Sequence, residues 1–365
     1  MYTLDRLAAK RYTEPFTKHL DDKNEEVLIR AQIAGVFGNT LVLSSLPEER
    51  ALVSLQKLAE DQGNRQVGGP DEMVRQACVD AIGKIGSPKS LETLANILNQ
   101  VNLSDRLKEA VVSAFYGILS RIDKDLDTLV TPPTVQKLIQ LVEQTTIDPE
   151  IRAEGMKTLA RLERAGVKTG NRVLPVIQKV LEKENNKVLV VAAVEALGIT
   201  GKDEALDSLL KAFKDFYSEP NSKAYENDLA IRKVIAKTFA YMLSAQREKR
   251  PAPNAEAVAT IAKTLISIID PSAERKEHKD VKRSAVSSLR YLYPLTSPFK
   301  EHHKDALSRL IYLMRDVEDF KDAQDTVIET AVYLSRQDFG KDVLRWEKWF
   351  DETYPGVRVK RDTPK

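Results

Sequence analysis

The stretch PDEMVRQACVDAIGKIGSPKSLETLANIL, residues 70–98, decides how the rest of the chain is understood. It opens with acidic residues, continues as a helix with periodic apolar positions, breaks at glycine and resumes as a Leu-rich amphipathic helix. The stretch NKVLVVAAVEALGITGKDEALDSLLKAF, residues 186–213, repeats this order in degraded form. A unit of helix, break and helix that recurs along one chain predicts a repeat array.

An apolar–basic dipeptide marks the start of the second helix in each unit. It is Val74-Arg75 in the quoted stretch, and its counterparts are Ile29-Arg30, Leu107-Lys108, Ile151-Arg152, Ile231-Arg232 and Val281-Lys282. The basic residue is lost in two further units, at Leu189-Val190 and Thr326-Val327. Successive dipeptides lie 33 to 50 residues apart, and this range fits helical-hairpin solenoids, whose period is about 40–47 residues.

The second helix of each unit has a recurring apolar stripe. In the quoted stretch the stripe consists of Val74, Ala77, Cys78, Ala81 and Ile82, at helical spacing. Its small residues allow neighbouring helices to approach closely. One repeat cannot bury so wide an apolar arc, so the units must stack on one another.

An acidic residue precedes most of these helices, at Asp71, Asp105, Asp148, Asp228, Asp280 and Asp325. Aspartate there accepts hydrogen bonds from the free N–H groups of the helix start. The aspartate, the apolar–Arg pair and the Ala-rich second helix together resemble HEAT repeats, including the variety named after phycobilisome lyases. The resemblance covers about residues 13–338 and implies an Asp–Arg ladder along the stack: Asp71 with Arg75, Asp148 with Arg152, and Asp228 with Arg232. Val190 departs from this pattern, which predicts a missing rung in the fifth unit.

We therefore expect an all-α fold. It is a right-handed, armadillo-like α-solenoid superhelix of about eight HEAT-like antiparallel helix pairs plus a C-terminal capping helix. Residues 1–353 form one continuous solenoid in this prediction, and residues 354–365 form a basic, flexible C-terminal tail. Trp346 and Trp349 lie three residues apart on the last helix. They are predicted to cover the open end of the stack, with a role as partner anchors as the alternative.

Composition and charge indicate a soluble protein. The 365 residues are 42% hydrophobic and carry a net charge of +2. The single Cys78 cannot form an internal disulfide, and it forms no metal-ligand pattern with the four histidines, so no cofactor is expected. The chain has no apolar run of transmembrane length and does not begin like a signal peptide, which favours the cytoplasm.

The polar face of the late second helices is the candidate partner-binding surface. Positions opposite the apolar stripe are predicted to line the concave surface of the solenoid. In the late units these positions and their neighbours are basic or aromatic: Lys233, Lys237, Tyr241, Arg283, Arg290 and Tyr291. From residue 231 onward the chain has 26 Lys and Arg against 20 Asp and Glu, a net charge of +6, whereas the preceding part has a net charge of −4. A merely solvated charged face is the alternative interpretation.

The leading functional hypothesis is a non-enzymatic scaffold that binds a protein or an extended peptide in the concave groove. The partner is acidic if the basic half binds it. Nucleic-acid binding, including the DNA glycosylase activity of some HEAT-like enzymes, is the alternative, although the basic bias is modest. Chromophore-lyase activity is a third hypothesis and rests on the repeat resemblance alone.

Overall fold

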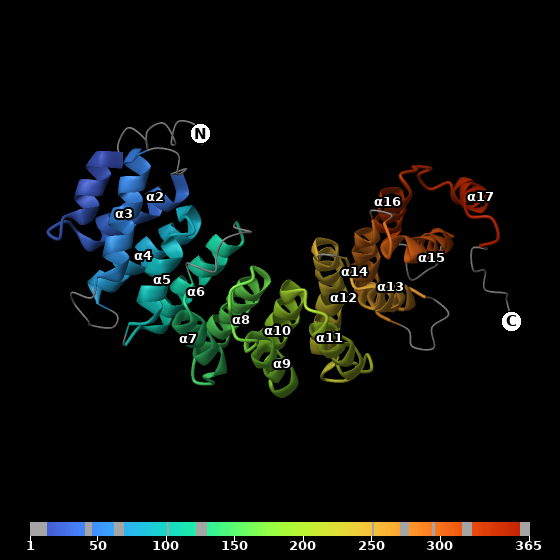
Figure 1. Cartoon of the computed structure of the whole chain (residues 1–365), viewed down its shortest axis with the longest axis horizontal. Coiled ribbons are helices and arrows are strands. Elements are labelled where there is room, and N and C mark those ends of the chain that lie inside the picture. The colour runs from blue at the N-terminus through green and yellow to red at the C-terminus, as the bar shows by residue number, and fades with distance from the viewer. Residues whose placement is uncertain are drawn as a thin grey trace. The chain divides into compact units, whose positions relative to one another are not determined.

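The computed structural model describes residues 13–40, 46–61, 69–100, 102–121, 130–249, 252–270, 277–293, 296–315 and 323–357. All regular secondary structure within these ranges is helical (Figure 1). The first helices of the pairs are residues 13–21, α3 (Leu46–Glu60), α5 (Ser90–Leu98), α7 (Pro132–Glu143), α9 (Val173–Lys183), α11 (Glu204–Asp215), α13 (Ala255–Ile268) and α15 (Phe299–Leu313). The second helices are α2 (Val27–Thr40), α4 (Pro70–Ile85), α6 (Asp105–Leu119), α8 (Pro149–Arg164), α10 (Lys187–Thr200), α12 (Tyr225–Glu248), α14 (Lys279–Leu289) and α16 (Gln324–Ser335). A 3₁₀ turn, η1 (Arg290–Leu292), continues α14, and α17 (Val343–Thr353) follows the last pair.

The predicted alternation of first and second helices is thus confirmed. Helices of both kinds start where the sequence provides a cap or a proline, as α6, α8 and α13 show. The Ser104 hydroxyl accepts from the Leu107 N–H at 3.2 Å, and the Asn254 side chain accepts from the Glu256 N–H at 3.1 Å. Pro149 occupies the first position of α8, where its missing N–H costs no hydrogen bond.

The predicted apolar stripe forms the core. Val74, Cys78, Ala81 and Ile82 are each at most 2% exposed. The second helices α4, α6, α8, α12, α14 and α16 each pack against the first helix of their own pair, and successive second helices pack along the rows α2–α4–α6–α8 and α12–α14–α16. No helix in the described ranges is both long enough and apolar enough to cross a membrane.

Glycine sets the closest helix approach in the first of these rows. Gly83 of α4 faces Ala114 of α6 so closely that a Cβ built on Gly83 would lie 2.8 Å from the Ala114 Cα. Gly38 of α2 has the same relation to Ala81 of α4, also at 2.8 Å. Backbone atoms cannot retreat as a flexible side chain can, so these two positions require glycine.

The chain divides into two compact units, Met1–Ala196 and Leu197–Lys365, and the boundary falls within α10. The continuity of the solenoid over residues 1–353 and its handedness stay predictions. Most of the predicted tail, residues 358–365, lies outside the described residues.

Gly83→Ala should lower the free energy of unfolding by about 1–3 kcal/mol, because the new methyl group would overpack against the α6 backbone. Gly35→Ala in α2 is the matched control, since a Cβ there would meet no atom within 4 Å. The control should be neutral or should stabilise by about 0.5–1 kcal/mol, because alanine favours helix. Urea unfolding of both variants checks this, and equal effects would contradict the proposed close approach.

Candidate functional site

A buried arginine near the start of α8 joins three helical segments. Arg152 is 5% exposed. Its Nε donates to the carbonyl of Val142 in the last turn of α7 at 2.8 Å, and its Nη2 donates to Glu184 Oε1, just after α9, at 2.6 Å. Carbonyls at a helix C-terminus lack intrahelical partners and carry partial negative charge. Arg152 therefore ties the first helix of its own pair to the next pair.

The same arrangement recurs in other pairs. Arg75 Nε donates to the Ala59 carbonyl at 3.1 Å, and its Nη2 donates to Gln100 Oε1 at 2.6 Å. Arg232 donates to the Phe213 carbonyl and pairs with both carboxylate oxygens of Glu277. In each case one nitrogen satisfies a first-helix carbonyl and another reaches an oxygen of the next pair. We call each such arginine and its two acceptors a rung.

The predicted Asp–Arg pairing takes a different form in the structure, since the three arginines use the acceptors just described. Asp148 caps its own helix instead, accepting from the Glu150 N–H at 2.9 Å. A hydrogen bond with the Glu150 side chain, and then this backbone hydrogen bond, lower the pKa of the Asp148 carboxyl. Asp228 accepts from the Ser218 hydroxyl. Asp71 lies in the first turn of α4. The aspartates therefore stabilise helix starts and nearby loops, whereas the arginines connect pairs.

The fifth unit lacks this arginine, as the sequence pattern suggested. Val190 stands at the position and is only 1% exposed. Asn186 replaces the capping aspartate and accepts from the Val188 N–H at 2.9 Å. An apolar side chain therefore fills this position of the unit.

The two tryptophans of α17 lie in an aromatic cluster. Trp346 is fully buried, and its Nε1 donates to the Gly340 carbonyl at 3.0 Å. Trp349 is half-buried, with its ring centroid 6.0 Å from that of Trp346 and 6.2 Å from that of Tyr354. The helix packs on α15 of the last pair. Trp346 is thus part of the internal packing of this end of the chain, and the capping role of the two tryptophans stays a prediction.

His303 of α15 lies beneath this cluster. It is 2% exposed, its Nε2 lies 3.0 Å from the Leu334 carbonyl, and its Nδ1 lies 3.3 Å from the Tyr354 hydroxyl. Burial lowers the pKa of His303 below its ordinary value of 6.5, and the hydrogen bond to Leu334 offsets part of this effect. The histidine therefore has a structural role in the packing of α15 against the aromatic cluster.

Lys233, Lys237 and Tyr241 form one exposed stripe on α12. They are spaced four residues apart, so they lie on one side of the helix, and Tyr241 is 38% exposed. Within the described part of the chain, neither lysine has a hydrogen-bond or ion-pair partner. Both ammonium groups are therefore available to a binding partner.

The three candidates from α14 and η1 differ in availability. Arg283 is about half-exposed, with its Nη1 3.9 Å from Asp280. Arg290 is engaged with α16, because its Nη2 pairs with Glu329 at 2.8 Å and its Nε donates to Thr330 at 3.1 Å. Tyr291 is 37% exposed. Arg290 thus helps to hold α14 against α16, whereas Tyr291 presents its ring to solvent.

The sequence pattern missed a set of aromatic and cationic groups beside Tyr291. Tyr333 of α16 is 40% exposed, and its ring packs edge-on against Tyr293 at 5.7 Å between centroids. The Arg336 guanidinium stacks over both rings, 4.1 Å from Tyr293 and 4.8 Å from Tyr333. Arg247 of α12 donates to the Tyr291 carbonyl and lies 5.7 Å from its ring centroid. This cluster connects α12, η1 and α16.

Cys78 offers no nucleophile. Burial raises the pKa of its thiol to about 12, so the thiolate form is suppressed at neutral pH. Across the residues that the structure describes, no group of three or more His, Cys, Asp or Glu side chains is arranged to hold a metal ion.

Two segments, residues 74–100 and 189–215, match the family model of the PBS lyase HEAT-like repeat. The chain carries HEAT-like repeats. Both segments begin at the apolar residue of the recurring dipeptide, at Val74 and Leu189, so the resemblance read from the sequence is confirmed. No curated protein sequence matches the chain.

Several solved structures are similar to this chain. Kap121p bound to Pho4p is similar over 91% of this chain and 34% of its own, with 13% identity and a TM-score of 0.51. The structure of a Kap121p mutant is similar over 92% of this chain and 34% of its own, with 14% identity and a TM-score of 0.53. The CpcE–CpcF complex of phycocyanin lyase from Nostoc sp. PCC7120 is similar over 80% of this chain and 92% of its own, with 18% identity and a TM-score of 0.42. The chain spans about a third of the length of Kap121p, and its likeness to Kap121p shows a HEAT-repeat solenoid fold.

The HEAT-repeat chain should lose stability on mild acidification through His303. Its folded-state pKa is lowered by burial, so its contribution is fully present above its unfolded value of 6.5 and is lost as the pH falls below that value. The melting temperature should therefore fall more between pH 7.5 and 5.5 in the wild type than in His303→Gln. His302→Gln, one residue away, is the control and should retain the wild-type dependence; identical pH profiles for all three proteins would contradict the assignment.

Proposed function

We propose that this HEAT-repeat protein is a non-enzymatic scaffold that binds an acidic protein segment on the exposed side of α12, η1 and α16. The surface consists of Lys233, Lys237, Tyr241, Tyr291 and Tyr333, and we call it the Lys–Tyr face. The observation that carries the proposal is the pair of unpartnered ammonium groups in line with an exposed tyrosine on α12. Two further exposed tyrosines lie on elements that pack beside α12 or α14.

The chemistry of this face suits protein recognition. A tyrosine ring supplies a large, stiff contact area with a polar tip, and such rings are enriched at binding hot spots. Arg336 stacked over Tyr333 reduces the motion of that ring before a partner arrives. The lysines add long-range attraction for an acidic partner, which chiefly accelerates association.

The backbone N–H and C=O groups of these helices are already hydrogen-bonded within the helix. The protein must therefore recognise a partner through its side chains, and not by pairing with a β-strand of the partner. Repeat solenoids offer extended surfaces for such recognition. Kap121p, which has a similar fold, has been solved bound to Pho4p, to Nup53p and to Ste12p. That likeness supports a binding role for this chain.

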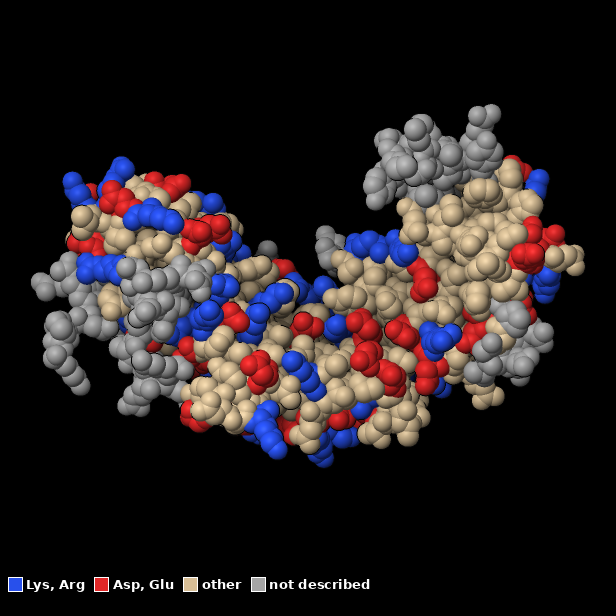
Figure 2. Space-filling model, turned by 180° about the vertical axis from the view of Figure 1, so that it is seen from behind, with Lys and Arg blue, Asp and Glu red and all other residues tan. Residues whose placement is uncertain are grey.

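Opposite charges are interspersed on one face of the molecule. Figure 2 shows Lys and Arg side chains among Asp and Glu side chains on the face that it presents. A protein that tracks a nucleic-acid backbone needs a basic stripe. Local charge on the Lys–Tyr face therefore favours a short acidic segment as the partner.

The test compares two doubly charge-reversed variants of the full chain. Lys233→Glu with Lys237→Glu alters the Lys–Tyr face, and Lys263→Glu with Lys300→Glu makes the same charge change on exposed positions of the first helices α13 and α15. Proteins captured from the native source by the wild type are identified by mass spectrometry, and the association rate of the purified partner is then measured with each variant. We expect the face variant to slow association by on the order of tenfold at low salt, with unchanged melting temperature.

The first-helix variant should associate at the wild-type rate. Tyr241→Ala should instead raise the dissociation rate, because it removes contact area rather than charge. A partner that binds the face variant with unaltered rate and affinity would contradict the proposed site. If the wild type captured duplex DNA and both charge variants lost DNA binding equally, the nucleic-acid alternative would be favoured.

A further inference from the structure

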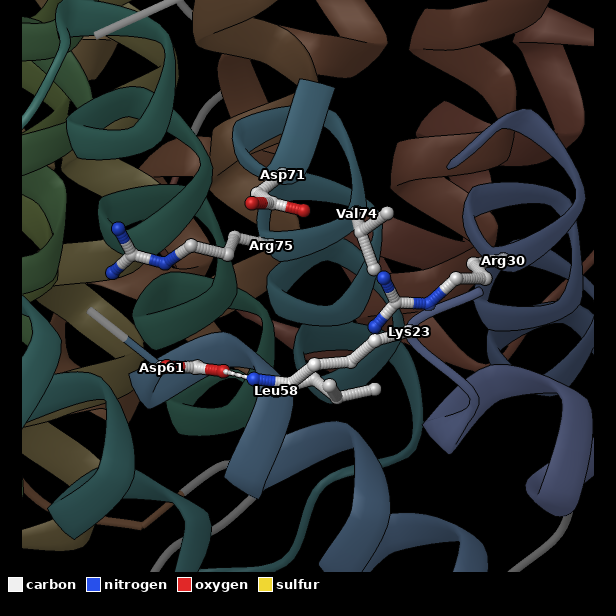
Figure 3. Close-up of a pocket in the computed structure, with 7 residues that line it drawn as sticks. All are labelled: Lys23, Arg30, Leu58, Asp61, Asp71, Val74 and Arg75. Carbon is white, nitrogen blue, oxygen red and sulfur yellow. Dashed lines mark ion pairs between the residues drawn. The ribbon is translucent and has the colours of Figure 1, made fainter. Parts of the chain in front are cut away.

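A polar cavity of about 360 Å³ lies between the first two helix pairs, far along the sequence from the Lys–Tyr face. Figure 3 shows the seven residues that line it: Lys23, Arg30, Leu58, Asp61, Asp71, Val74 and Arg75. They come from the turn before α2, the start of α2, the end of α3 and the residue after it, and the start of α4. This volume lies at the lower end of the range for small-ligand sites.

Arg30 occupies the rung position of the first pair and is only 5% exposed. Its Nε donates to the Leu20 carbonyl at 3.0 Å, as the Nε groups of Arg75 and Arg152 do to carbonyls of their own first helices. Its two outer nitrogens make no hydrogen bond or ion pair with any residue that the structure describes. Figure 3 shows this guanidinium directed into the space between Asp71 and Lys23.

The other rungs indicate which acceptor groups the outer nitrogens of such an arginine bind. An oxygen of the next pair fills this role for Arg75, Arg152 and Arg232, and it comes from the Gln100 amide or from the carboxylates of Glu184 and Glu277. Asp61 follows α3 directly, as Glu184 follows α9. Asp61 is instead paired with Lys23, whose Nζ lies 3.6 Å from its Oδ2.

We propose that this cavity binds a carboxylate at the end of a short aliphatic chain, with the Arg30 guanidinium as its principal donor. A planar guanidinium with two free donors matches a carboxylate bidentately. Leu58 and Val74 supply the apolar wall against which the methylene groups of the ligand pack. The glutamate side chain of a peptide and a free dicarboxylate such as glutarate share this chemistry.

The remaining charges set the strength of binding. Three cationic side chains and two carboxylates line the cavity, so its net charge is positive. Asp71 has no hydrogen-bond or ion-pair partner among the described residues and opposes an incoming anion. Lys23 keeps Asp61 from competing for Arg30. Removal of the Asp71 charge should therefore strengthen carboxylate binding, and removal of the Lys23 charge should weaken it.

Isothermal titration of the full chain tests the proposal with two probes. One is glutarate, with glutaramide as its neutral isostere, and the other is an N-acetylated, C-amidated Ala-Ala-Glu-Ala-Ala peptide, with Gln in place of Glu as its control. We expect saturable binding of at least one carboxylate probe and about tenfold weaker binding of its neutral counterpart, a difference of about 1.4 kcal/mol. Binding of glutarate alone assigns a free dicarboxylate as the ligand, whereas binding of the peptide alone assigns an acidic segment.

Three variants of the cavity and one control variant locate the binding. Arg30→Lys keeps the charge but loses the bidentate donor, and should weaken binding by about tenfold. Asp71→Asn should strengthen it several-fold, a gain that a folding defect cannot mimic. Lys23→Gln should weaken it, whereas Lys179→Gln, which removes an exposed lysine from a comparable ion pair with Glu143, should have no effect.

Equal binding of carboxylates and amides, or no saturable binding of either probe, would overturn the proposal. So would unchanged affinity in both Arg30→Lys and Asp71→Asn. None of these outcomes bears on the Lys–Tyr face, because the lysine variants of that face leave every residue of this cavity intact.

Discussion

The carbonyl groups at the C-terminal end of each first helix are the groups that the rest of the stack must satisfy. They have no partner in their own helix, and the neighbouring second helix brings apolar side chains against them. A buried arginine resolves this at several pairs, as Arg152 does for Val142. The same guanidinium also reaches the next pair, so a local capping requirement becomes a link between repeats. Burial strengthens such a charge-assisted link and makes the loss of one partner costly.

The close packing of the second helices has a consequence for function. Gly38 and Gly83 let helices approach until little more than the apolar stripe lies between them. Residues on the outer side of a second helix take no part in such packing, and Lys233 and Lys237 are exposed examples on α12. Some outer residues do take part in contacts between helices, as Arg290 does with Glu329 and Thr330, and their side chains are then not available to a partner. Candidate surfaces are thus defined by the residues that the stack does not use.

Much of the fold could be predicted from the sequence, because helix periodicity and caps are local. The stripe from Val74 to Ile82 and the helix start at Asp148 follow from short-range patterns, and both lie as expected. The partners of the arginines could not be predicted in the same way. Arg152 lies one turn after Asp148 in sequence, yet its acceptors come from α7 and from the segment after α9, which only stacking brings together.

The candidate site was only partly predictable for a related reason. Tyr241 belongs to a regular helix, so its exposure follows from the helical register. Tyr293 lies just past a 3₁₀ turn, and Arg336 adopts a left-handed conformation at the end of α16 with φ of +61°. The helical register cannot predict where a side chain lies once the backbone has left the helical geometry. The sequence signal that would have identified these residues is the clustering of Tyr and Arg near helix ends.

A double-mutant cycle between Arg152 and Glu184 tests most directly whether buried arginines couple successive repeats. The exposed pair Lys179–Glu143 joins the first helices α9 and α7 of the same two pairs at 3.1 Å and serves as the reference. Urea unfolding of the single and double alanine variants gives the coupling energy of each pair. We expect about 1.5–3 kcal/mol for the buried pair and about 0.2–1 kcal/mol for the exposed one. A coupling energy for Arg152 and Glu184 no larger than that of the exposed pair would contradict the role of the arginine rungs.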